Sequence, residues 1–140
     1  METDLKAILP QPTAATRPFW EACDREELLL AHCEECGNDF YYPRLACPHC
    51  GNRRLGWRKS TGRGRVFSFS HVQMSFHGPA WETQLPYTVI LVELEEGPRM
   101  LSRLIGDGRA NVKSGDPVEV VFPEIDGQKL PYFRPSRSTA

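Results

Sequence analysis

The chain has 140 residues, of which 40% are hydrophobic and 25% are charged, and its formal net charge is −1. This length suits one ordinary domain or two very small ones sharing a core, and it excludes a sizeable multi-domain enzyme. The composition is typical of a soluble globular protein, and the small net charge gives no overall reason to bind nucleic acid or an anionic membrane. Because no basic region precedes an apolar run at the N-terminus, and no apolar stretch approaches about 18 residues, we expect a cytoplasmic protein without a membrane partner.

The N-terminal part is expected to contain an arm followed by one helix. Residues 1–17 include two prolines and few large apolar side chains, which suits an extended arm or a short, loosely held helix. Pro18 is a favourable first helical residue, and the segment PFWEACDREELLL then spaces its apolar residues three and four apart. We therefore predict an amphipathic helix over residues 18–30.

Five short runs in the second half predict β-strands, because they are rich in β-branched and aromatic residues. These runs are residues 65–72, 87–94, 99–104, 117–122 and 129–135. The stretches EEGP at 95–98 and EIDGQ at 124–128 are typical of hairpin turns. Five such strands in about 80 residues suit a small closed or partly open barrel such as an OB-fold. The connection over residues 73–86 is too long for a hairpin, and loops of this length are usually functional or disordered.

Four of the five cysteines form two Cys-x-x-Cys pairs, Cys33 with Cys36 and Cys47 with Cys50. Each such turn points two sulfurs the same way, so the pairs can supply four thiolates to a tetrahedral metal site. A glycine directly follows each pair, and its freedom to adopt positive φ lets the backbone wrap the metal. We predict a closed, structural site with Zn²⁺ as the default occupant and iron, as in a rubredoxin, as the less favoured one.

Other chemistry-bearing residues do not form a catalytic set. Cys23 is expected to be a small buried hydrophobe rather than a reactive thiol, and His71 lies near no suitably spaced nucleophile or acid. The chain contains no glycine-rich phosphate loop and no nucleophile elbow, so we expect a binding module without a catalytic centre of its own. An acid-free block binds anions or merely offsets the charge of a zinc tetrathiolate. Its cations are Arg44, Arg53, Arg54, Arg58, Lys59, Arg63 and Arg65.

The order of these motifs resembles a family of small proteins in which a rubredoxin-like zinc ribbon is fused to an acyl-CoA-associated OB-fold. The resemblance rests on PFWEACDREELLLAHCEECGNDFYYPRLACPHCGN, GRGRVFSFSHV, LPYTVILVELEEGPRMLSRLIG, VKSGDPVEVVF and LPYFRP, and it covers most of residues 18–135. It implies a mainly β protein with an N-terminal helix, a zinc ribbon and a five-stranded OB barrel. The expected division is an arm and helix over residues 1–30, the ribbon over 31–58 and the OB-fold over 59–140.

The same resemblance implies a non-catalytic accessory subunit in a hetero-oligomer with a thiolase-like protein. Members of the family accompany thiolases, acyltransferases and the aldolases that shorten sterol side chains, and the reactive group belongs to the partner. Such a subunit helps to bind acyl-CoA at or near the interface. A 3′-phosphoadenosine diphosphate needs cations and flat rings. The candidates for contact with CoA are therefore Arg63, Arg65, Phe76, His77 and Trp81.

Three other functions compete with this interpretation. Zinc ribbons and OB-folds also bind single-stranded nucleic acid, although the net charge of −1 weakens that alternative. A four-cysteine iron site would transfer electrons and would colour the protein red. A free-standing small enzyme is disfavoured because the sequence shows no catalytic constellation.

Overall fold

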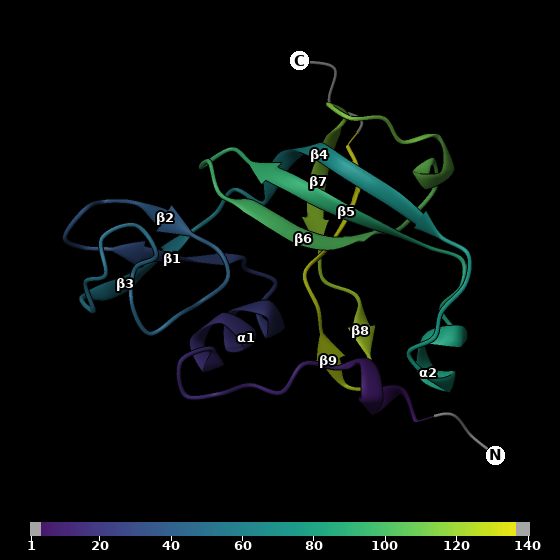
Figure 1. Ribbon diagram of the computed structural model, residues 1–140, viewed down its shortest axis with the longest axis horizontal. Helices are drawn as coiled ribbons and strands as arrows, with labels where there is room; N and C mark the ends of the chain where they lie inside the picture. The colour runs from purple at the N-terminus through teal and green to yellow at the C-terminus, as the bar shows by residue number, and fades with distance from the viewer. Residues whose placement is uncertain (1–3, 137–140) are drawn as a thin grey trace.

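The computed structural model describes residues 4–136, whose main parts are one helix and two β-structures (Figure 1). A three-stranded sheet carries the four cysteines, and a closed five-stranded barrel follows it. Helix α1 (Arg17–Asp24) lies beside both, and a short 3₁₀ helix, η1 (Leu5–Ile8), precedes it. Within residues 4–136, no helix is both long and apolar enough to cross a membrane.

Helix α1 is shorter than the sequence predicts. It buries Phe19, Trp20 and Cys23 as expected, but it ends at Asp24, and the prediction of a helix to residue 30 is wrong. The backbone N–H groups of residues 25–27 turn back onto the carbonyls of Ala22 and Cys23 and close the last turn. Leu29 and Leu30 enter strand β1 (Leu29–Cys33) instead, because a strand with a partner on each side satisfies its backbone and buries Leu30 completely.

The cysteine-bearing sheet has the order β2-β1-β3 and is antiparallel throughout. Strand β2 covers Asp39–Phe40 and β3 covers Leu55–Lys59. One cysteine pair lies at the end of β1 and in the turn to β2, and the other lies in the loop from β2 to β3. The two Cys-x-x-Cys turns therefore meet at one end of a single small sheet.

The barrel has the strand order β10-β6-β5-β4-β7 and closes through pairing of β10 with β7. All pairs are antiparallel except β10 with β6, and this is the arrangement of an OB-fold. The strands are β4 (Arg63–Val72), β5 (Tyr87–Leu94), β6 (Arg99–Leu104), β7 (Pro117–Val121) and β10 (Tyr132–Pro135). The predicted fold, a zinc ribbon with a five-stranded OB barrel, is confirmed.

The predicted strand bounds differ from the structure mainly at the last strand. Residues 128–129 do not belong to β10 but form β9 (Gln128–Lys129), which pairs with β8 (Glu124–Ile125) in a small hairpin. The turn of this hairpin falls within the predicted EIDGQ stretch. The other long connection, residues 73–86, contains the short helix α2 (Pro79–Glu82), and the 3₁₀ helix η2 (Arg109–Asn111) connects β6 to β7.

One apolar core runs from α1 through the barrel. Phe19 and Leu30 pack in the same cluster as the barrel residues Ile90, Met100 and Phe133, and all five are fully buried. Alternation along β1 directs Ala31 and Cys33 to a second, smaller cluster inside the sheet of cysteines. The ribbon and the barrel are therefore held together by packing through α1 and β1 as well as by the chain itself.

The GRGR stretch at 62–65 has a structural explanation. At Gly64, a Cβ atom would lie 2.5 Å from the carbonyl oxygen of Glu93 and 2.7 Å from Cγ1 of Val92. Strand β4 approaches β5 here more closely than a side chain allows. The glycine therefore permits this close pairing and does not mark a nucleotide-binding loop.

Candidate metal centre and ligand pocket

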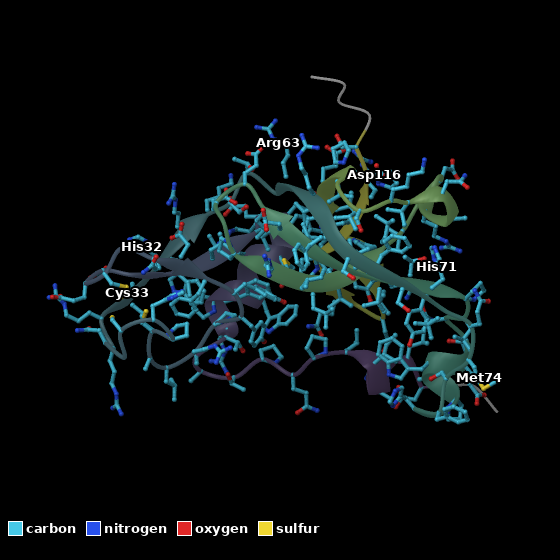
Figure 2. All side chains as sticks on the ribbon, turned by 45° about the horizontal axis from the view of Figure 1, so that its top comes forward. His32, Cys33, Arg63, His71, Met74 and Asp116 are labelled. Carbon is cyan, nitrogen blue, oxygen red and sulfur yellow. The ribbon has the colours of Figure 1, made fainter. Side chains whose placement is uncertain are left out.

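The four predicted cysteines come together in the structure. Their Sγ atoms all lie within 4.8 Å of one another, and the Cys33–Cys50 and Cys36–Cys47 pairs are both 3.6 Å apart. A tetrahedral tetrathiolate with bonds of about 2.3 Å places its sulfurs roughly 3.8 Å apart. The donor set and its spacing therefore fit one tetrahedral metal ion, and Figure 2 shows this cluster at the end of the molecule marked by Cys33.

The two Cys-x-x-Cys turns have matching backbones. Gly37 and Gly51 have φ of 77° and 79°, and each donates its N–H over 2.9 Å to the carbonyl of the first cysteine of its pair. The backbone N–H groups of Cys36 and His49 point at the sulfurs of Cys33 and Cys47, each over 3.4 Å. Such N–H groups stabilise thiolate charge, so the conformation itself suits metal ligation.

The cysteine thiols differ in acidity when no cation lies between them. The backbone N–H of Asn38, followed by its side-chain amide, lowers the pKa of Cys36 to about 6. The backbone N–H of Asn52 also lowers the pKa of Cys50, but burial and the three neighbouring thiols outweigh it and raise that pKa to about 12. Four thiolates repel one another at this spacing, and a central cation removes that repulsion.

An ion-pair network that the sequence did not reveal lies beside the cluster. Asp39 on β2 accepts from Arg58 on β3 over 2.8 Å and lies 2.7 Å from Nδ1 of His32 on β1. Its side chain is only 5% exposed. The carboxylate thus cross-links all three strands of the cysteine-bearing sheet. The sequence indicates this network only when the register of the sheet is known, because that register places Asp39 opposite His32.

Four of the seven cations in the acid-free block lie close to carboxylates. Arg54, Lys59 and Arg63 approach carboxylates of residues outside the block, at N–O distances of 3.5, 3.8 and 3.4 Å. Arg58 pairs with Asp39 as described, and Nη1 of Arg65 donates to the carbonyl of Gly115 over 3.0 Å. Most of the block is therefore neutralised locally, which agrees with its interpretation as a solvated face.

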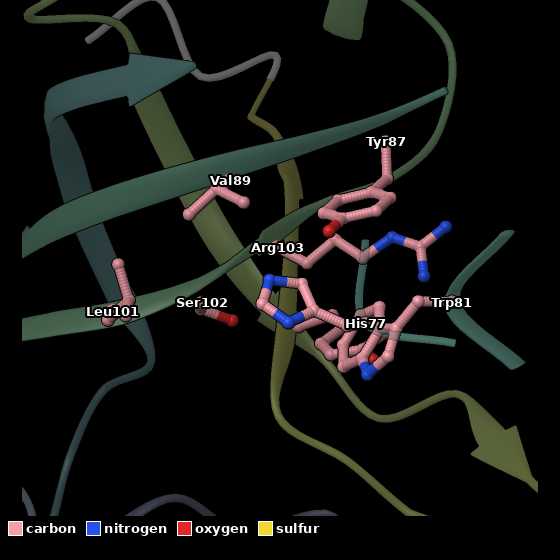
Figure 3. Close-up of a pocket in the computed structure, with 8 residues that line it drawn as sticks. His77, Trp81, Tyr87, Val89, Leu101, Ser102 and Arg103 are labelled. Carbon is pink, nitrogen blue, oxygen red and sulfur yellow. The ribbon is translucent and has the colours of Figure 1, made fainter. Parts of the chain in front are cut away.

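A pocket of about 490 Å³ opens on the barrel (Figure 3). It lies against β5 and β6, the second and third barrel strands, and the connection over residues 73–86 covers one side of it. OB-folds bind their ligands on this face, between the loops that follow the first and fourth strands. The residues that line it are His77, Trp81, Tyr87, Val89, Leu101, Ser102, Arg103 and Tyr132.

The structure brings only some of the predicted CoA-contact residues to this pocket. His77 and Trp81 line it, whereas Phe76 is not among the lining residues and is 88% exposed. Arg63 and Arg65 lie at the other end of β4, since it is Val72 that pairs with Tyr87. Arg63 and Val72 are nine positions apart along this strand, which corresponds to about 30 Å. The five residues therefore do not form one small site.

Arg103 is the cation that the structure places in the pocket, and it is not among the residues that the sequence indicates. Its guanidinium lies 5.4 Å from the ring centre of Tyr87 and 5.6 Å from that of Tyr132, and Nη1 donates to Gln84 over 2.9 Å. Burial raises the pKa of Tyr132, and the charge of Arg103 partly offsets this effect. The position of Arg103 follows from the hairpin around EEGP. Its register pairs Glu93 with Arg99 and therefore Val89 with Arg103.

Comparison with known proteins matches both halves of the chain in order. Residues 20–56 match the rubredoxin-like zinc ribbon domain of ChsH2, and residues 57–123 match the C-terminal OB-fold domain of ChsH2. A solved structure described as an Ltp2-ChsH2(DUF35) aldolase contains a chain with 31% identity and a TM-score of 0.78. The match covers 91% of this chain and 98% of that one. A DUF35 protein of unknown function from Sulfolobus solfataricus shares the fold, with a TM-score of 0.62 and 17% identity.

Relatives of two sizes are found among curated proteins. A DUF35 domain-containing scaffold protein from Methanothermobacter thermautotrophicus is 32% identical over 81% of this chain and 84% of its own length. A probable enoyl-CoA hydratase alpha subunit from Thermomonospora curvata is 34% identical over 94% of this chain, but the chain spans only 41% of that protein. The matches over both halves, and over most of the smaller relatives, show that the chain belongs to the DUF35 family, in its ChsH2 form with a rubredoxin-like zinc ribbon and a C-terminal OB-fold domain.

Proposed function

We propose that this chain is a non-catalytic accessory subunit of a thiolase-superfamily complex that processes acyl-CoA substrates. The observation that carries the proposal is the match, over nearly the whole of both chains, to a chain of the Ltp2-ChsH2(DUF35) aldolase. The scaffold protein named above supports a role in an assembly, and the name of the hydratase alpha subunit supports an assembly that acts on a CoA ester. In this role the reactive group belongs to the partner, and the chain helps to hold the substrate and stabilise the complex in the cytoplasm.

The exposed apolar residues support a partner surface. Phe67 and Phe69 point outward from β4 and are 47% and 37% exposed. The connection that follows adds Met74 and Phe76, which are 68% and 88% exposed, and Figure 2 shows Met74 at the edge of the molecule. Large apolar groups gathered along one strand and its loop are typical of a protein interface rather than of a free surface.

We further propose that Zn²⁺ occupies the cysteine cluster and has a structural role. Cys33, Cys36, Cys47 and Cys50 would hold it, and four sulfur ligands complete a tetrahedral shell with no position for water or substrate. The metal would supply folding energy to a segment whose own apolar cluster is small. Iron fits the same ligands, so colour and metal analysis distinguish the two ions.

A pull-down from lysate of the source cell tests the accessory role. The tagged chain at moderate salt should recover a thiolase-like subunit in stoichiometric amount, identified by mass spectrometry. A Met74→Ser and Phe76→Ser double variant should recover less of it. Leu45→Ser serves as the matched control, because Leu45 is equally apolar and 78% exposed but lies on the ribbon. Recovery of nucleic acid, or of no stoichiometric protein, would overturn the proposal.

A further inference from the structure

We propose that the barrel pocket binds a ligand in which a phosphate or carboxylate is carried on a flat or apolar body, with Arg103 as the receptor of the anion. The inference deepens the proposed function and rests on it only for the identity of the natural ligand. Its physical basis is the state of Arg103 and the shape of the pocket around it.

Arg103 carries a charge that the protein does not neutralise. Among residues 4–136, no carboxylate lies within ion-pair distance of its guanidinium. Its Nε is fully buried and has no hydrogen-bond partner in that part of the chain, and the neighbours of the guanidinium are all neutral: the ring of Tyr87, the ring and hydroxyl of Tyr132, and the amide of Gln84. Leaving a cation partly desolvated without a counter-ion costs free energy, and an oxyanion in the pocket would recover it.

Arg99, on the same strand, has a counter-ion within the protein. Arg99 also lies over an aromatic ring, with its guanidinium 3.8 Å from the centre of Phe67, but its Nε approaches the Glu93 carboxylate over 3.4 Å. Arg103 occupies the equivalent face of β6 four residues later without such a partner. The difference between the two arginines identifies Arg103 as the one that is free to pair with an external anion.

The two ends of the pocket differ in chemistry. Figure 3 shows Arg103 with Tyr87 and Trp81 at one end, and Leu101 and Val89 at the other. The rings of Trp81 and Tyr87 lie 5.5 Å apart and give the cationic end flat walls. A volume of about 490 Å³ is within the usual range for small-ligand sites. An anionic group at Arg103 would therefore leave its ring or chain against the aromatic and aliphatic walls.

Two sources supply this chemistry in an acyl-CoA-processing complex. One is the nucleotide end of CoA, which carries phosphates beside a flat base, and the other is an apolar acyl group that ends in a free carboxylate. The two are distinguished by probes. Adenosine 3′,5′-bisphosphate represents the first source, and 3-phenylpropionate represents the second, with neutral 3-phenylpropanol as its uncharged match.

Isothermal titration of the purified full chain with each probe tests the proposal. At least one anionic probe should bind saturably, and Arg103→Gln should weaken that binding at least about tenfold, because a charge-assisted contact is lost. Arg99→Gln should leave it unchanged, and 3-phenylpropanol should bind more weakly than 3-phenylpropionate. Preference for the bisphosphate assigns the nucleotide source, and preference for the phenyl acid assigns the carboxylate source.

Three results would overturn the proposal. They are no saturable binding of either anionic probe, equal losses for the Arg103 and Arg99 variants, and, where the phenyl acid is the anionic probe that binds, equal affinity for its alcohol. If Arg103→Gln does not fold by circular dichroism, Trp81→Ala, which keeps the cation and removes a wall, replaces it and should also weaken binding. The pull-down of the wild-type chain is independent, so loss of the partner with retained probe binding would overturn only the accessory role.

Discussion

Trp20 donates its indole N–H to the hydroxyl of Tyr42 over 3.2 Å, and this bond links helix α1 to the loop that leads to the second cysteine pair. The ring of Phe19 packs edge-on against both, with ring centres 4.8 Å from Trp20 and 5.7 Å from Tyr42. Because Phe19 also belongs to the barrel core, these three rings form the junction of helix, ribbon and barrel.

Truncation of Phe19 should destabilise the whole molecule. Phe19 is fully buried, so Phe19→Ala removes its packing and leaves a cavity, at a cost of about 3–5 kcal/mol in the free energy of unfolding. Urea denaturation followed by circular dichroism measures this loss. Tyr42→Phe removes only the hydroxyl and should cost about 0.5–1.5 kcal/mol. Equal effects of the two variants would contradict a packing role for Phe19.

The four-cysteine cluster should hold one metal ion per chain. The purified protein should contain one zinc per chain by elemental analysis and should be colourless, and Cys47→Ser should lose most of this metal because a ligand sulfur is gone. Cys23→Ser is the matched control and should retain the full content, since Cys23 lies in α1 away from the cluster. A red protein that contains iron would contradict the zinc assignment but not the four-sulfur site.

Substitution of Gly64 should disturb the pairing of β4 with β5. An added methyl group would meet the backbone of Glu93 at 2.5 Å, so β4 and β5 would have to move apart, and Gly64→Ala should cost about 1–3 kcal/mol. Thermal unfolding compared with Ser68→Ala tests this, because Ser68 lies on the same strand but is exposed. If both variants melt at the wild-type temperature, the close crossing of β4 and β5 is not a constraint.

Local patterns predicted the elements well where the chain pairs with its near neighbours. The bounds of β5 and β6 agree with the predicted 87–94 and 99–104, because alternation and a short turn together set a hairpin register. The cysteine spacing likewise located the metal-type cluster. Each of these signals lies within about twenty residues of sequence.

Features that depend on distant contacts were not predicted. The end of α1 was missed because Leu29 and Leu30 pair with residues 58 and 59, which lie about thirty positions away. The local sequence indicates Arg63 and Arg65 as anion receptors because of their charge, whereas Arg103 lines the pocket because the folded barrel brings it close to Tyr132. Burial and pairing of this kind are properties of the tertiary structure.

Cys23 should stay unreactive as long as the protein is folded. It is fully buried in α1, and burial, followed by the negative charge of Asp24, raises the pKa of its thiol from 9.0 to about 12. Little thiolate therefore exists at pH 8, and a thiol-specific reagent should label Cys23 only at the rate of global unfolding. Mass spectrometry of the labelled, metal-loaded protein measures this rate. Labelling within minutes without unfolding would contradict burial of the thiol.

The same shift predicts a loss of stability in alkali. The folded protein keeps the proton of Cys23 up to about pH 12, whereas the unfolded chain releases it near pH 9.0, so the unfolded state binds fewer protons in between. The free energy of unfolding should therefore be unaffected by this group below pH 9 and should fall as pH rises toward 12. Cys23→Ala should show a shallower decline over that window in denaturation at stepped pH. Parallel curves for the wild type and the variant would show that the Cys23 thiol has the same pKa in the folded and unfolded states. This result would contradict its complete burial beside Phe19 and Leu30.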